Sequence, residues 1–298
     1  FCLKAVKNPV EIANTKNAHI KEGVAMARLQ MCLEEKLAAG ETVSETDVGE
    51  LLVDFRKEQE GYMEDSFAVI AAYGANAAMM HYHPTPENHA VLQRKGFLLL
   101  DTGGQYVDGT TDTTRTYALG ELTDEERRYY TYVLKANIGI ARTVFMEGCS
   151  GANLDIMSRT QIWKYGLDYR CGTGHGVGFV GPIHEGPQSL RMTNHVPFQP
   201  GMTITDEPGI YEEGLVGVRI ENELLVVEHM ETKYGKFYAF QPITYLPIDT
   251  TPVVLELMNE EEISWLNDYH QMVYDTLSPR MTERERIWLK EKTKPLEK

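Results

Sequence analysis

The sequence predicts an α+β protein that forms one domain over residues 1–298. Helix-like and strand-like segments both occur, but they do not alternate in the strict strand–helix order that is typical of a parallel sheet. No 20–50-residue repeat is present, and no segment is rich enough in Pro, Gly or Ser to divide the chain. With 298 residues, 42% of them hydrophobic, the chain can bury one large core.

The N-terminal part of the sequence predicts two helices. Asn8 is a suitable N-cap, Pro9 fits the first helical position, and Gly40 follows the end of a long amphipathic segment. A second helix begins after Ser44, because four apolar residues then share one face at helical spacing: Val48, Leu51, Leu52 and Phe55.

The remaining elements follow from capping residues and apolar runs. Residues 66–73 and 96–101 are predicted strands, and a capping box at Thr123 and Glu126 predicts a helix that continues to about Met146. A shorter helix is expected over 154–165, strands over 202–206 and 216–227, and two charged amphipathic helices from about Glu260 and Thr282.

The charge balance excludes some classes of partner. The chain has 29 Lys and Arg against 44 Asp and Glu, a formal net charge of −15, so it repels nucleic acid and anionic lipid. No run approaches the roughly 18 apolar residues of a membrane span. Four scattered cysteines make no disulfide framework, which favours a reducing compartment, and we expect a cytoplasmic protein. Because the chain starts at Phe1 without a leader, we expect a fragment or a processed chain.

A first pair of carboxylates lies around a predicted hairpin. Asp101 ends a run of leucines, and Asp112 opens the next strand-like segment, so antiparallel pairing would bring both carboxylates together. Asp108 lies between them in an Asp-Gly turn, where ordinary turn chemistry explains it.

A second pair has the same arrangement. Glu207 follows a short strand and precedes Pro208, and Glu221 interrupts an otherwise apolar strand. A carboxylate flanked by apolar strand residues is costly to bury without a partner. Asp206, next to Glu207, is interpreted as a turn residue.

Between the two pairs lies His175, surrounded by glycines that let the backbone approach whatever the imidazole holds. The glycine spacing fits neither a dinucleotide fingerprint nor a P-loop. Four carboxylates and one imidazole are a suitable ligand set for divalent metal ions, and two ions that share carboxylates are used in hydrolysis. The alternative interpretation is scattered surface acids and a core histidine.

Five segments of the chain resemble the metallopeptidases of the pita-bread fold, the M24 family of methionine aminopeptidase, prolidase and aminopeptidase P. They are DTGGQYVDGTTDTTRT, GTGHGVG, HEGP, TDEPGIY and GVRIEN. Together with the tail from FYAFQPITYLPIDTTPV onward, they are most similar to the long form of Xaa-Pro aminopeptidase. The resemblance covers nearly the whole chain. It implies curved antiparallel sheets covered by helices with pseudo-two-fold symmetry, and a catalytic domain without the N-terminal domains of the long form.

The resemblance also implies a ligand set and a reaction. Asp101 would hold one ion, Asp112 and Glu221 would bridge both, and His175 and Glu207 would complete the coordination shell of the second ion. The cofactors would be two divalent ions, Mn²⁺ in most relatives and Zn²⁺ or Co²⁺ as alternatives. A hydroxide that bridges the ions would attack the carbonyl before proline, with Glu207 as general base.

Further residues come from the same resemblance. His81 and His184 match family histidines of the substrate site and are expected to take part in catalysis. Arg219 is expected to orient a ligand carboxylate at the edge of the substrate pocket, with Tyr211 nearby. Cys171 stands where many aminopeptidases P carry a third pocket histidine, which puts the fit around the proline ring in doubt. His83 has no counterpart.

Three rival functions remain open at this point. A prolidase would share the five ligands but cut only Xaa-Pro dipeptides. A non-catalytic pita-bread module would bind peptides without metal, and the complete ligand set argues against it. A serine hydrolase is the weakest alternative, because the segment GCSGAN lacks the G-x-S-x-G elbow. The expected partners are peptides with proline at the second position and, by resemblance, a second copy of the chain in a homodimer.

Overall fold

A computed structural model describes residues 2–298. Its helices are α1 (Cys2–Ala5), α2 (Pro9–Ala38), α3 (Glu45–Lys57), α4 (Asp124–Ala141), α5 (Gly151–Leu154), α6 (Ile156–Trp163), α7 (Glu260–Leu277) and α8 (Glu283–Lys292). Short 3₁₀ helices cover Gly74–Ala78, Leu255–Leu257 and Ser278–Arg280. The predicted helix starts are confirmed, since capping boxes close on the N-cap residues Asn8, Ser44, Thr123, Asn259 and Thr282.

All strand pairs are antiparallel, which confirms the α+β class. The strands are β1 (Tyr62–Asp65), β2 (Ile70–Tyr73), β3 (Phe97–Thr102), β4 (Gly104–Tyr106), β5 (Gly109–Thr110), β6 (Thr113–Ala118), β7 (Val144–Met146), β8 (Gly174–His175), β9 (Ser189–Leu190), β10 (Thr203–Asp206), β11 (Gly209–Glu212), β12 (Val216–Arg219), β13 (Asn222–Thr232) and β14 (Gly235–Pro242). They form sheets in the orders β2-β3-β6, β10-β13-β14-β7, β1-β4-β5, β11-β12 and β8-β9.

Two predicted elements differ from the structure. The helix expected to reach Met146 ends at Ala141, because residues 144–146 pair with β14 instead. The strand expected over 216–227 is interrupted and forms β12 and β13, which pair with β11 and β10 in one continuous register. The interruption falls at Ile220 and Glu221, which belong to neither strand.

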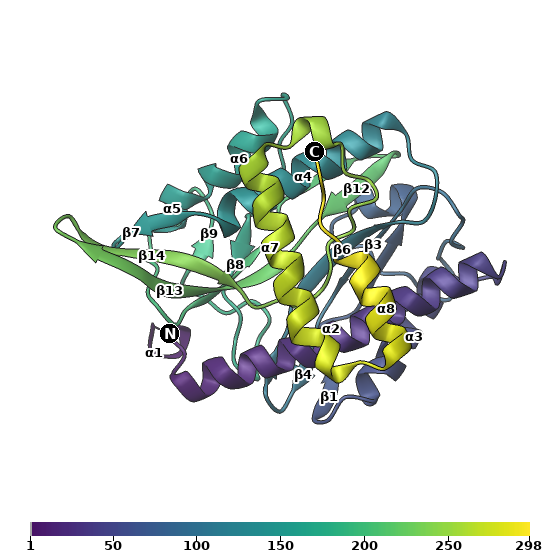
Figure 1. The fold of residues 1–298 in the computed structure, drawn as a ribbon, viewed down its shortest axis with the longest axis horizontal. Helices are drawn as coiled ribbons and strands as arrows, with labels where there is room; N and C mark the ends of the chain where they lie inside the picture. The colour runs from purple at the N-terminus through teal and green to yellow at the C-terminus, as the bar shows by residue number, and fades with distance from the viewer. Residues whose placement is uncertain (1) are drawn as a thin grey trace.

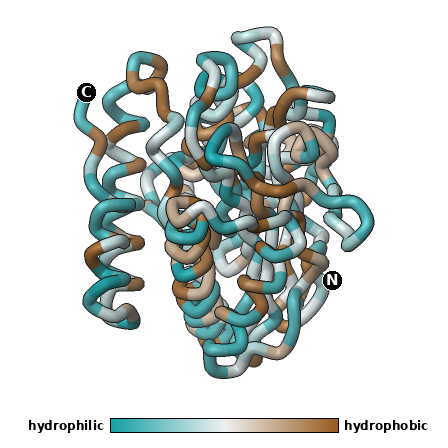
Figure 2. Tube along the Cα trace, turned by 90° about the vertical axis from the view of Figure 1, so that its right-hand side faces the viewer, coloured by the Kyte–Doolittle hydropathy of each residue, from teal (hydrophilic) through white to brown (hydrophobic). Residues whose placement is uncertain are grey.

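Helices cover the outer faces of these sheets. In Figure 1 the long purple α2 runs beneath the strands, α4 lies across their other end, and α7 crosses in front of both. Contacts join α4 to β10 and β12, and α7 to α2 and α4. Hydrophobic and hydrophilic residues alternate along the helical turns, as amphipathic helices require (Figure 2). Within residues 2–298, none of the helices combines the length and the apolar character that a bilayer crossing demands.

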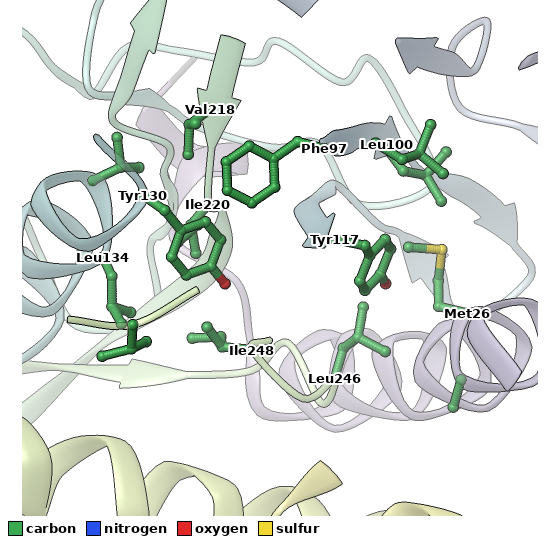
Figure 3. Close-up of a cluster of buried hydrophobic side chains, with 14 of the residues drawn as sticks. Met26, Phe97, Leu100, Tyr117, Tyr130, Leu134, Val218, Ile220, Leu246 and Ile248 are labelled. Carbon is green, nitrogen blue, oxygen red and sulfur yellow. The ribbon is translucent and has the colours of Figure 1, made fainter. Parts of the chain in front are cut away.

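The main core lies between these helices and the two central sheets. Phe97 from β3 stacks on Tyr130 from α4, with ring centroids 5.6 Å apart. Figure 3 shows Ile220 and Leu134 beside this pair. The strands are thereby held against α4 close to the interruption at Ile220 and Glu221.

A buried ion pair joins α2 and α3 to the end of β3. Arg56 is fully buried and donates to Glu22 (Nη2–Oε1 2.5 Å), to Asp65 (2.6 Å) and to the hydroxyl of Thr102 (2.7 Å). Glu22 also accepts a hydrogen bond from Tyr106 (2.8 Å). Removing one partner of such a pair leaves an uncompensated buried charge.

We therefore expect Arg56→Met to lower the free energy of unfolding by about 3–5 kcal/mol, because Glu22 would remain buried without its cation. Urea denaturation measures the change. Lys57→Met is the matched control, since Lys57 lies on the same helix and forms a solvent-exposed ion pair with Asp54. Equal effects of the two substitutions would contradict the assignment.

Candidate metal centre

The two predicted carboxylate pairs lie at equivalent ends of two antiparallel strand pairs. The β3–β6 ladder ends with Thr102 opposite Thr113, which places Asp101 and Asp112 next to each other. The β10–β13 ladder ends with Asp206 opposite Asn222, so that Glu207 and Glu221 lie just beyond it. In each case the same hairpin continues in unchanged register beyond the carboxylates, as β4–β5 in one and as β11–β12 in the other. Each pair therefore lies at an interruption within a single hairpin.

His175 joins the two pairs. Its Nε2 lies 3.4 Å from Asp112 Oδ2 and 3.2 Å from Glu207 Oε1. Ligand atoms of Asp112, His175 and Glu221 all lie within 4.8 Å of one another. Because Nδ1 donates to the carbonyl of Gly176 (3.0 Å), the lone pair of a neutral imidazole would be on Nε2, facing the carboxylates.

The residues fit divalent metal ions. Asp101 Oδ1 is buried and has no hydrogen-bond partner within residues 2–298. Asp112 and Glu221 are almost fully buried with other carboxylates around them, an arrangement that is costly unless cations or protons compensate it. Hard oxygen donors with one imidazole suit Mn²⁺ as well as Zn²⁺ or Co²⁺.

Two threonines that the sequence analysis did not single out hold the glutamates. Thr205 donates to Glu207 Oε1 (3.0 Å), and Thr114 donates to Glu221 Oε2 (2.7 Å). The Thr205 hydroxyl also accepts the backbone N–H of His175 (3.0 Å). Thr205 stands two residues before Glu207 and Thr114 two residues after Asp112, and this strand spacing is the signal that could have indicated them.

Arg219 lies against Asp101, not against Glu221. Its Nη2 donates to Asp101 Oδ2 (2.6 Å), its Nη1 to the Tyr211 hydroxyl (2.8 Å), and its Nε to Thr114 (3.3 Å). The guanidinium therefore orients one carboxylate and leaves that carboxylate's second oxygen free.

The site opens into a cavity of about 270 Å³. Its apolar lining consists of Phe67, Ala68, Ile70, Met80 and Ile183. Its polar lining consists of His81, His83, Asp101, Asp112, Cys171, His175, His184, Glu207, Tyr211 and Arg219. His81 and His184 are exposed, and the ring centroids of His184 and His175 are 4.1 Å apart.

Two expectations concern residues next to the site. Asp206 is not a turn residue: it ends β10 and is fully buried, on the side of the strand away from the cavity lining. Asp108 lies outside the cavity and accepts hydrogen bonds from Asn17 (3.0 Å) and Lys21 of α2, in keeping with a structural turn.

Protonation in the absence of metal follows from burial and crowding. Burial raises the pKa of Asp112 to about 7, and burial together with neighbouring carboxylates raises the pKa of Glu221 well above its ordinary value. Burial opposes the charged form of His175, but the hydrogen bonds that it donates to Asp112 and Glu207 raise its pKa well above the ordinary value. Burial also opposes ionisation of Glu207, yet His175, Arg219 and Thr205 lower its pKa. Glu207 is thus ionised near pH 7.

Burial raises the pKa of the Cys171 thiol to about 11. The thiol is therefore neutral near pH 7 and does not supply a nucleophile. It remains a small, weakly polar part of the cavity wall.

Gly174 makes the close approach of β8 to β10 possible. A Cβ atom on Gly174 would lie 1.7 Å from the carbonyl oxygen of Thr205. We expect Gly174→Ala to separate the strands, displace His175 and weaken metal binding by at least about tenfold, measured by isothermal titration. Gly49→Ala on helix α3 is the control, since its Cβ meets only ordinary contacts with Val69. Unchanged metal affinity in Gly174→Ala would refute the argument.

The pKa shifts also predict a pH dependence. Without metal the native protein holds protons on Asp112, Glu221 and His175 that the unfolded chain releases, so its free energy of unfolding falls as pH rises from about 5 to 8. Metal displaces these protons. The increase in Tm produced by Mn²⁺ should therefore grow across this range in differential scanning calorimetry, and a constant increase would contradict the shifts.

Comparisons with known proteins agree with this geometry. The model of metallopeptidase family M24 matches residues 13–228, and that of the C-terminal region of M24 peptidases matches residues 236–296. The chain is 42% identical over 302 residues to aminopeptidase P2 of Arabidopsis thaliana, covering 99% of this chain and 42% of the relative. It is 39% identical over 305 residues to Xaa-Pro aminopeptidase 1 of Dictyostelium discoideum, covering 98% and 48%. The chain thus spans less than half the length of these relatives.

Solved structures extend the comparison. The X-prolyl aminopeptidase of Caenorhabditis elegans, described as a cytosolic enzyme with a di-nuclear active site, superposes with a TM-score of 0.94 at 35% identity, over 99% of this chain and 49% of that one. The Xaa-Pro dipeptidase of Bacillus anthracis superposes with a TM-score of 0.69 at 30% identity, over 83% and 64%. The pita-bread fold predicted by resemblance is confirmed, and the chain belongs to metallopeptidase family M24.

Proposed function

We propose that this chain is the catalytic domain of an aminopeptidase that uses two divalent metal ions to hydrolyse the peptide bond between an N-terminal residue and proline. The observation that carries the proposal is the cavity itself, in which one imidazole and converging carboxylates occur together with an apolar lining. The names of the similar proteins support the same activity.

In this proposal Asp101, Asp112, His175, Glu207 and Glu221 hold two ions, with Mn²⁺ as the first choice and Zn²⁺ or Co²⁺ as alternatives. The metal ions would lower the pKa of a bound water, so that it can attack as hydroxide at neutral pH, and they would also polarise the substrate carbonyl. The acidic cavity also attracts the free amino group of a peptide, which accounts for removal of a single N-terminal residue.

The chain's own residues do the remaining work. Glu207 is ionised and half-buried beside His175, so it can accept the proton of the attacking water as general base. His81 and His184 reach the cavity without being buried and can donate hydrogen bonds to the substrate carbonyl and the developing oxyanion. Arg219 keeps Asp101 in place.

The apolar lining suits the proline ring. The proline ring is apolar, and the residue has no backbone N–H that would need a hydrogen-bond partner in the cavity. Phe67, Ile70 and Met80 offer carbon surface, and Cys171 leaves more room than a histidine would.

An aminopeptidase is favoured over a prolidase by the extent of the match. The curated relatives and the C. elegans structure, which match 98–99% of this chain, are named as aminopeptidases. The structures that cover 83% of it include both a dipeptidase and the X-Pro aminopeptidase of Thermotoga maritima. We further infer a cytoplasmic location, in keeping with the cytosolic C. elegans relative and with free thiols at Cys32, Cys149 and Cys171. The homodimer rests on family resemblance, and sedimentation equilibrium would measure it.

The proposal predicts that the metal-stripped chain releases arginine from Arg-Pro-Pro once Mn²⁺ is added. Chromatography measures the released arginine. Glu207→Gln should lower kcat by about 10²–10⁴-fold, because the general base is lost. Metal content is measured alongside, so that loss of the base is separated from loss of an ion.

Other outcomes would redirect the assignment. Cleavage of Arg-Pro alone would indicate a prolidase. Peptide binding by an inactive, metal-free chain would indicate a binding module. Two bound ions with neither peptide cleaved would overturn the proposed substrate.

A further inference from the structure

Asn137 of helix α4 lies directly behind the candidate metal centre and is fully buried. Its Nδ2 donates to the carbonyl oxygens of Asp206 (2.9 Å) and Ile220 (3.3 Å). These two carbonyls belong to the peptide groups that immediately precede Glu207 and Glu221. One side chain therefore contacts the backbone next to a glutamate from each half of the site.

The opposite sides of the same two peptide groups are also held. The N–H of Glu207 donates to the carbonyl of Thr173 (2.8 Å), and the N–H of Glu221 donates to the carbonyl of Thr114 (3.0 Å). Thr173 stands two residues before His175. A continuous line of hydrogen bonds thus runs from the segment of His175 to strand β6, with the Asn137 amide at its midpoint.

The chemistry of the amide determines its orientation. Only the NH₂ group can donate to two carbonyl oxygens at once, and the reverse orientation would place an oxygen against both. The Asn137 oxygen has no hydrogen-bond partner within residues 2–298, so no competing contact draws the amide the other way.

The position of Asn137 coincides with a gap in the sheet. The β10–β13 ladder ends at Asp206, and the β11–β12 ladder begins at the pair of Gly209 with Arg219. The register is the same on both sides, but between these two pairs no strand–strand pairing connects the peptide groups before the two glutamates. The two N–H groups of Asn137 bridge this gap.

The helix that carries Asn137 is firmly anchored. Leu134 and Tyr130, one and two turns before it, pack beside Ile220 in the main core, as Figure 3 shows. Its neighbours Ala136 and Ile138 are fully buried. A donor on such a helix can fix the backbone of two loops that the sheet itself does not pair.

We propose that Asn137 is a positioning residue that sets the separation and direction of Glu207 and Glu221 as metal ligands. The inference rests on the proposed function for the identity of these ligands. A peptide group that rotates carries the following Cα–Cβ bond with it, so losing the amide would displace both carboxylates together. Small displacements of ligands weaken metal sites and reaction rates.

The test replaces Asn137 by leucine, which has a similar size and no donor. We expect Asn137→Leu to bind Mn²⁺ about 10–100-fold more weakly. The visible absorption of the Co²⁺-loaded protein should also change, and kcat should fall more than KM rises. Ile138→Val on the same helix is the control, because it removes a buried methylene without touching either carbonyl. Its metal titration and Co²⁺ spectrum should match those of the unmodified chain.

Asn137→Asp provides a second variant of nearly identical size. Buried as a neutral acid, it keeps one donor and should give an intermediate loss of metal affinity. If the leucine variant does not fold, this variant decides. The proposal is overturned if the folded variant titrates Mn²⁺ and absorbs with Co²⁺ as the unmodified chain does. Failure of the proposed function would instead appear in the unmodified chain, as metal binding without release of arginine.

Discussion

Mutual repulsion between four carboxylates in one buried pocket is the constraint that the surrounding structure has to satisfy. Arg219 neutralises Asp101, His175 lies between Asp112 and Glu207, and Glu221 holds a proton when no metal is bound. These interactions do not fully offset the repulsion between the carboxylates unless further cations bind. Affinity for divalent ions is therefore a consequence of how the chain folds.

Buried cations and hydrogen-bond donors outside the pocket help to compensate this repulsion. Arg115 is fully buried and donates to the carbonyls of Thr114 (2.9 Å), Glu221 (2.6 Å) and Leu246 (2.9 Å). It also contacts the hydroxyl of Tyr269 on α7 (2.9 Å). The C-terminal region thus supports the same strand ends that Asn137 supports from α4, and the two halves of the centre are braced from opposite sides.

Features of local origin could be predicted from the sequence. Helix starts at Ser44 and Thr123 follow from capping chemistry within four residues. The carboxylates were indicated because each interrupts or ends an apolar run. What could not be predicted depends on distant partners: the strand break at Glu221, the buried place of Asp206, and the donor positions of Asn137, Thr114 and Thr205. Nothing in the residues around Asn137 distinguishes it from an ordinary helical asparagine.

The separation of the two carboxylate pairs along the chain has a consequence for biosynthesis. The candidate ligands extend from Asp101 to Glu221, and β10 cannot complete its ladder until β13 has left the ribosome. At a translation rate of roughly 5–20 residues per second, many seconds pass between synthesis of the first carboxylate residue and synthesis of the last. The nascent chain therefore carries the first pair, already joined by the local β3–β6 ladder, before the second pair exists. The complete ligand set belongs to the finished domain.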